Sequence, residues 1–221
     1  MNGLARCSKK MIMSACAVLL FVSLTGDARA QAEDSPYEIG LRFVVLNARG
    51  EPTNDMLGGG LYGRYRLNDR WLIGAAVDSV SGDFERPYEL VGLASPKEID
   101  ATDDSLLISV WAEREYGNPA RKSRWFWGAG LGFTSPDVND VTGPVTGGGT
   151  FDLTTDAGSE TLVMLNGGFR TRIGRRFSFE VSVRADQHFA DWKITDRMSG
   201  MTGTIDDYTV VGLNVGGAIR F

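Results

Sequence analysis

The feature that most constrains this chain is a two-residue alternation of apolar with polar or small side chains, recurring in eight segments after residue 30. Successive side chains of a β-strand point to opposite faces, so each segment predicts a strand with one apolar face. No long apolar stripe at helical spacing accompanies them. We therefore expect an all-β fold. The predicted strands are 37–45, 57–67, 71–78, 106–115, 125–133, 161–173, 177–186 and 211–221.

The two faces of these segments differ in charge. The apolar faces, for example Trp71, Ile73 and Val77, contain no charged residue. A soluble barrel or sandwich is the alternative, but it would have to fit many Trp and Phe side chains into one interior. The pattern favours a closed barrel whose apolar face contacts lipid. The charged residues of the opposite faces are Glu38, Arg42, Arg64, Arg66, Asp78, Glu113, Glu115, Arg170, Arg172, Glu180, Arg184, Asp186 and Arg220.

The connectors between the predicted strands alternate in length. The short ones are 68–70, 117–123 and 174–176, and the other four are long. Outer-membrane barrels have this asymmetry, with tight periplasmic turns and long extracellular loops. Aromatic residues gather beside the short connectors, as expected at a membrane interface. These aromatic residues are Tyr37, Tyr65, Trp71, Tyr116, Trp125, Phe177 and Phe221.

The N-terminal segment has the three parts of a secretory signal peptide. Basic residues precede the apolar stretch Met11–Thr25, and Ala28–Ala30 supplies small residues at a cleavage site. We expect residues 1–30 to be a cleaved signal peptide and 31–221 to be the barrel domain. The alternative is a lipoprotein box ending at Cys16, which would be acylated.

The last strand carries a further signal. Asn214, Gly216, Ile219 and Phe221 form the spacing polar-x-Gly-x-x-apolar-x-aromatic. This spacing resembles the C-terminal assembly signal of bacterial outer-membrane β-barrel proteins, which the barrel-assembly machinery reads by strand addition. The whole mature chain resembles the small eight-stranded barrels of the OmpA, OmpX and opacity-protein type.

The resemblance and the strand pattern together predict the fold class. We expect one eight-stranded antiparallel transmembrane β-barrel of up-and-down topology, with short periplasmic turns and long extracellular loops. It would lie among the lipids of the outer membrane of a diderm (Gram-negative) bacterium, after export by the signal peptide. The formal net charge of −5 argues against a nucleic-acid partner, because no basic surplus is available to neutralise phosphates.

The inward faces predict a plugged interior, since eight strands enclose a space that side chains fill. Buried charges must be paired, so we expect an ion-pair network in the lumen. Its predicted members are Arg42, Glu113, Arg170, Glu180 and Arg184. A proton or ion pathway along the same residues is the alternative.

We expect a structural outer-membrane protein, with possible surface recognition through the acidic loops 83–104 and 134–158. One alternative is a loop-mediated adhesin or ligand binder. The other is a lipid-modifying enzyme, because outer-membrane lipid A deacylases have similar strand numbers and use a His and a Ser. The one histidine is His188, and the position of that Ser is occupied by Ala190. We therefore expect no enzyme activity, no cofactor and no metal site.

Overall fold

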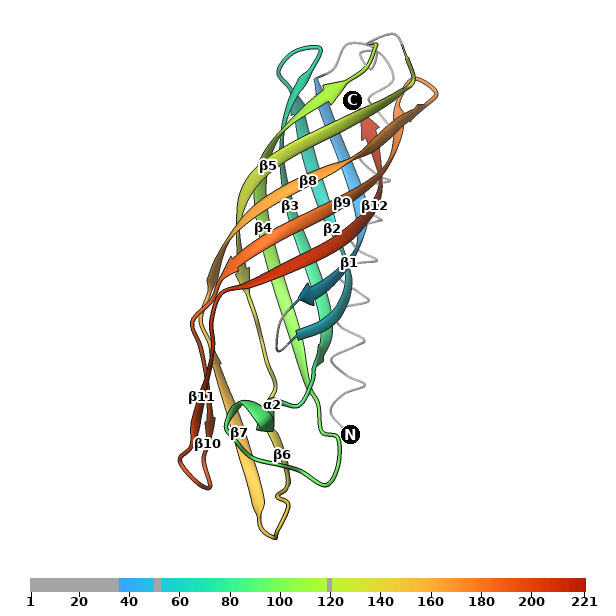
Figure 1. The fold of residues 1–221 in the computed structure, drawn as a ribbon. Helices are drawn as coiled ribbons and strands as arrows, with labels where there is room; N and C mark the ends of the chain where they lie inside the picture. The colour runs from blue at the N-terminus through green and yellow to red at the C-terminus, as the bar shows by residue number, and fades with distance from the viewer. Residues whose placement is uncertain (1–35, 50–52, 119–120) are drawn as a thin grey trace. The chain divides into compact units, whose positions relative to one another are not determined.

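The computed structural model describes residues 36–49, 53–118 and 121–221, in which eight strands close into a barrel (Figure 1). Every neighbouring pair is antiparallel, and β1 pairs with β12 to complete the ring. The predicted fold class is confirmed. The predicted signal peptide and Cys16 lie outside the described residues. The barrel strands are β1 (Tyr37–Arg49), β2 (Thr53–Arg66), β3 (Trp71–Phe84), β4 (Ala101–Tyr116), β5 (Ser123–Ser135), β8 (Glu160–Ile173), β9 (Phe177–Phe189) and β12 (Tyr208–Arg220).

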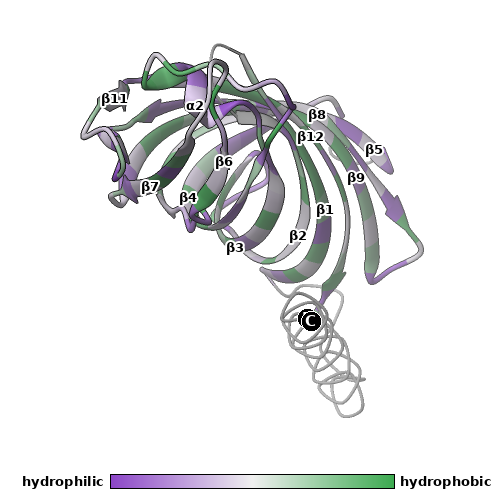
Figure 2. Cartoon of the chain, turned by 90° about the horizontal axis from the view of Figure 1, so that it is seen from below, coloured by the Kyte–Doolittle hydropathy of each residue, from purple (hydrophilic) through white to green (hydrophobic). Residues whose placement is uncertain are grey.

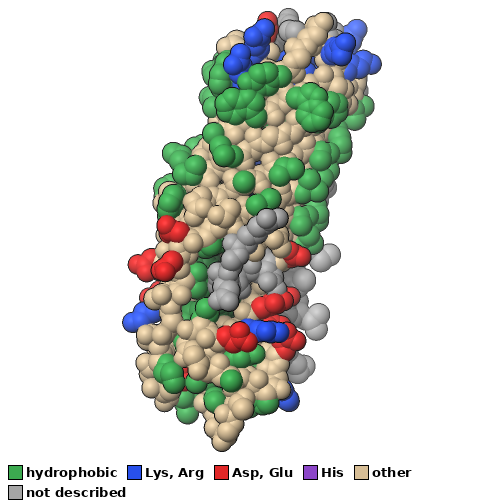
Figure 3. All heavy atoms as spheres, in the orientation of Figure 1, with side chains coloured by type: hydrophobic (Ala, Val, Ile, Leu, Met, Phe, Trp, Pro, Cys, Tyr) green, Lys and Arg blue, Asp and Glu red, His purple; other side chains and the backbone are tan. Residues whose placement is uncertain are grey.

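The two faces of the barrel wall lie as the alternation predicts. Hydrophobic and hydrophilic residues alternate along the strands (Figure 2). Trp125 is 66% exposed on the outside, whereas its neighbour Phe126 is 3% exposed on the inside. On the face seen in Figure 3, hydrophobic side chains are spread over the barrel wall, and Lys and Arg gather at the end that bears the short connectors. An apolar exterior of this kind suits a lipid environment rather than water.

The prediction of a long connector at 46–56 is wrong. β1 continues to Arg49 and β2 begins at Thr53. Both strands extend because Leu46 and Met56 point inward and join a buried apolar cluster with residues of β3 and β12. This extension could not be recognised in the sequence, because the inward residues here are apolar like the outward ones. Apolar and polar residues therefore do not alternate in this part of the strands.

The long connectors after β3, β5 and β9 fold into a second structure, which we call the cap. A four-stranded sheet in the order β11-β10-β7-β6 forms most of it, with the short helix α2 (Pro87–Leu90). No helix in the described parts of the chain is long and apolar enough to cross a membrane. The cap strands are β6 (Val141–Pro144), β7 (Thr150–Ala157), β10 (Trp192–Asp196) and β11 (Thr202–Ile205).

The cap has an apolar core of its own. Phe151, Trp192 and Ile194 are at most 1% exposed, and Tyr88 of α2 stacks on Phe151 with ring centroids 5.7 Å apart. The acidic segments 83–104 and 134–158, which were expected to be loops, thus contribute α2, β6 and β7 to a packed structure. Acidic residues outnumber basic ones in both segments, but a few large apolar residues on short strands are sufficient to build a core.

Candidate functional site: the barrel interior and the cap

The interior nearest the short connectors holds a dense group of ion pairs centred on Arg170. Its guanidinium binds Glu113 at 2.5 Å, Glu115 at 2.6 Å and Glu180 at 2.8 Å. Arg64 adds a second contact to Glu180 at 2.5 Å. The strands carry these residues on inward positions of β2, β4, β8 and β9, so side chains far apart in sequence meet across the barrel.

Further arginines surround this group. Glu115 also binds Arg66 at 3.0 Å and Arg124 at 2.7 Å. Glu38 pairs with Arg220 of the neighbouring strand β12. We call these residues the inner ion network. Its members are Glu38, Arg64, Arg66, Glu113, Glu115, Arg124, Arg170, Glu180 and Arg220.

A separate ion cluster lies farther along the strands toward the cap. The Nε of Arg42 donates to Asp78 at 2.8 Å. Arg184 donates to Asp186 at 2.6 Å, and its Nη1 lies 3.5 Å from Asp78. The five predicted residues are thus divided: Glu113, Arg170 and Glu180 meet in the inner ion network, whereas Arg42 and Arg184 meet around Asp78.

Aromatic rings fill the space between the charged groups. Tyr62, Trp111 and Phe126 are each at most 5% exposed and point inward. The Arg170 guanidinium lies 4.6 Å from the centroid of Phe126, and that of Arg64 lies 4.4 Å from Tyr62. A cation placed against an aromatic ring is stabilised electrostatically. Rings and ion pairs together thus occupy inward positions at this level of the barrel.

The interior next to the cap contains the one histidine. Nδ1 of His188 lies 2.7 Å from Glu160, and its ring stacks on Tyr208 at 4.7 Å. The Trp192 indole and the Tyr208 hydroxyl also donate to Glu160. His188 is 5% exposed and faces inward. His188 lies two residues after the inward-facing Asp186, and this spacing in a strand could have indicated that it also faces inward.

Glu160, Arg124 and Asp103 are inward charged residues that sequence reasoning missed. Each lies at or beyond the end of a predicted strand, where the alternating segment is too short to assign a face. Glu160 is the first residue of β8 and is 1% exposed. Extending the two-residue period outward from the strand centres would have placed all three inside.

The outer turns of the cap are tightly organised. Asp196 accepts hydrogen bonds from the Ser199 hydroxyl and from the backbone N–H groups of Asp152, Met198 and Ser199. Desolvation raises the pKa of Asp196, but these hydrogen bonds outweigh it and hold that pKa below its usual range. Beside this turn Arg197 binds Asp140 at 2.9 Å.

The contacts in these two regions are ion pairs, hydrogen bonds and aromatic packing. Within the described residues, no group of three or more His, Cys, Asp or Glu side chains could hold a metal ion. Ala190, where the deacylase serine would stand, packs against the apolar core of the cap. The geometry around His188 is a buried hydrogen-bond network that joins barrel and cap.

Comparison with known proteins identifies the fold. The outer membrane protein OprG from Pseudomonas aeruginosa aligns with a TM-score of 0.62 at 10% identity, over 86% of this chain and 97% of that chain. Neisserial surface protein A aligns with a TM-score of 0.54 at 14% identity, over 85% and 98%. No protein-family model and no curated protein sequence matches the chain. The chain therefore has the fold of the small eight-stranded outer-membrane barrels, as the sequence resemblance predicted.

Proposed function

We propose that this chain is an outer-membrane protein of a Gram-negative bacterium, in which an occluded barrel anchors a folded cap at the cell surface. The observation that carries the proposal is the division of the wall: exposed Trp, Phe, Leu and Val outside, and a paired charge network inside. Two solved structures with this fold bear the names of an outer membrane protein and a surface protein.

The proposal includes how the chain reaches the outer membrane and is assembled there. Residues 1–30 would direct export and be removed after Ala30, and the last strand would engage the barrel-assembly machinery. In β12, Asn214 points inward toward Ser182, with 3.5 Å between Nδ2 and Oγ. Ile219 lies opposite Phe177 and Ile39 in register. The assembly signal would thus be read before these strand pairings form.

Cell fractionation tests the membrane location. We expect the protein in the outer-membrane fraction, released only by detergent, with different gel mobility in SDS before and after boiling. The physical reason is that a closed barrel satisfies its backbone hydrogen bonds internally and resists SDS until heated. Recovery in the soluble periplasmic fraction without detergent would contradict the assignment of Leu41, Val181 and Leu213 to the lipid-facing wall.

A second function, recognition of a surface partner by the cap, is favoured by the order of the cap. Hydrogen bonds from Met198 and Ser199 to Asp196 order the β10–β11 turn, which reduces the entropy lost on binding. At this turn Met198 is 66% exposed and Met201 is 43% exposed, although both are apolar. Exposed methionines on an ordered turn suit contact with an apolar patch of a partner.

Adhesion of expressing cells to surfaces coated with individual extracellular-matrix proteins tests this second function. The Met198→Ser/Met201→Ser double variant is expected to lower cap-dependent adhesion roughly tenfold, as loss of an interface hot spot does. Lys193→Ser, on the exposed side of β10, is the matched control and should adhere as the wild type does. Equal adhesion of the double variant would argue against the turn as the contact.

A further inference from the structure

Arg114 breaks the charge pattern of the barrel wall. The outward residues of β4 run Leu106, Ile108, Val110 and Ala112, and the next outward residue is Arg114. Among residues of the eight barrel strands whose side chains the structure describes, it is the one Lys or Arg on the outward face. The predicted apolar face of this segment ends at Ala112, two residues before Arg114.

The guanidinium of Arg114 lies among the aromatic residues next to the short connectors. It is 5.8 Å from the ring centroid of Trp71 and 5.2 Å from that of Tyr116. Its Nε is buried and has no hydrogen-bond partner, and no ion pair links it to any described side chain. A cation held this way at a membrane interface lacks an anion, and a phosphate oxygen can supply one.

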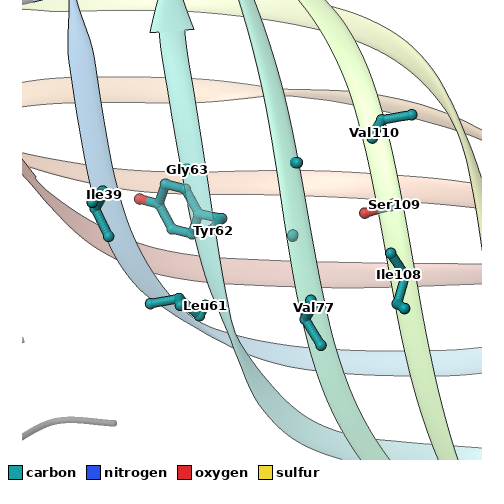
Figure 4. A pocket seen from close by; sticks show the side chains of 10 residues that line it. Ile39, Leu61, Tyr62, Gly63, Val77, Ile108, Ser109 and Val110 are labelled. Atoms are coloured by element: carbon teal, nitrogen blue, oxygen red, sulfur yellow. The ribbon is translucent and has the colours of Figure 1, made fainter. Parts of the chain in front are cut away.

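An apolar groove lies on the same wall, farther from the short connectors (Figure 4). It has a volume of about 310 Å³, and Gly63 and Ala75 at its centre leave room between larger apolar neighbours. Val110 lines it on β4. From Arg114 to Val110 is four residues, or roughly 13 Å along the strand, which the strand tilt reduces to roughly 10 Å of depth.

That separation matches the structure of a membrane lipid. The headgroup region is roughly 5–7 Å thick on each side of the hydrocarbon core, so a phosphate at Arg114 would place the groove among acyl chains. The short connectors add charge: they contain Arg70, Arg121, Lys122, Arg175 and Arg176 against the single acid Asp69. This end of the barrel is complementary to an anionic headgroup.

We propose that the β3–β4 wall binds one anionic phospholipid of the periplasmic leaflet, with its phosphate on Arg114 and one acyl chain in the groove. The proposal rests on the proposed membrane location. Trp71 and Tyr116 hold the guanidinium at headgroup depth, and the groove selects for a chain attached to that phosphate. The site is therefore a specific lipid site within an otherwise unselective apolar wall.

Native mass spectrometry of the full chain refolded in detergent, with dioleoyl phosphatidylglycerol as the probe, tests this site. Arg114→Gln is expected to weaken phosphatidylglycerol binding roughly tenfold, the loss expected for a charge-assisted hydrogen bond. Arg121→Gln removes the same charge from an exposed connector and should weaken binding much less. Ala75→Phe, which fills the groove, should also lower phosphatidylglycerol binding.

Three outcomes would overturn the site. They are equal binding by Arg114→Gln and the wild type, equal loss in Arg114→Gln and Arg121→Gln, and binding of dioleoylglycerol, which lacks the phosphate, as tight as that of phosphatidylglycerol. Gel mobility before and after boiling is measured on every variant. A chain that shows no heat-dependent shift contradicts the barrel itself, whereas a shifted chain with unaltered lipid binding contradicts only the site.

Discussion

Replacing Arg170 with methionine is expected to lower the free energy of unfolding by about 3–5 kcal/mol, because it removes one partner from each of three buried ion pairs. Glu113, Glu115 and Glu180 would then lose their shared guanidinium. Methionine keeps much of the aliphatic stem, so the loss reports charge pairing rather than a cavity. The measurement is urea-induced unfolding and refolding in detergent or lipid vesicles.

A graded series makes this prediction specific. Glu113→Ala should cost less than Arg170→Met, because Arg170 retains Glu115 and Glu180. Glu113→Ala should lower the free energy of unfolding more than Val110→Ala does. Val110→Ala removes two methyl groups from the outward face, which should cost ~1 kcal/mol or somewhat more. Equal stability of Glu113→Ala and Val110→Ala would mean that the interior is wet or that the two faces are reversed.

Trp192→Ala is expected to unfold the cap while the barrel remains closed. Trp192 is 1% exposed, packs edge-on against Phe84 at 6.3 Å and donates to Glu160. Truncation of a buried Trp costs about 3–5 kcal/mol, more than a small sheet with one core can be expected to retain. Limited proteolysis should then cleave the segments 136–159 and 190–207, and the same segments of the wild type should resist cleavage because the cap core is packed.

The control for this experiment is the barrel itself. The heat-dependent gel shift should persist in Trp192→Ala, because the eight barrel strands pair without the cap strands. A Met198→Ser variant, altered at an exposed position, should remain protected from protease. If Trp192→Ala unfolds barrel and cap together, the two structures form one cooperative unit, and the barrel is not an independent anchor.

The barrel was predictable because a closed wall between lipid and a charged interior imposes the same alternation on every strand. Leu41 and Arg42 already show the rule on β1, where one faces outward and the next faces inward. The alternation gives no signal where the inward side is also apolar. Leu46 and Met56 therefore appeared to belong to a loop, although they are buried inside the barrel.

The ion-pair partners of the inward residues and the fold of the cap could not be predicted from the sequence, for different reasons. Glu113 had an identifiable face, but its partner depends on strand register and barrel shear, which alternation does not determine. The sequence therefore groups Arg42 with Glu113 in one predicted network, whereas Arg42 binds Asp78. The cap depends on contacts among three separate connectors, such as Phe151 with Tyr88, and no local pattern specifies these contacts.

The central claim is that paired charges and aromatic rings block the lumen of an eight-stranded barrel. Planar-bilayer recording from the refolded wild-type protein tests it most directly. With Trp111 and Phe126 inside beside the inner ion network, we expect no stable large conductance at any holding potential at which the bilayer itself is intact. Reproducible porin-sized openings from the monomer would contradict an occluded interior.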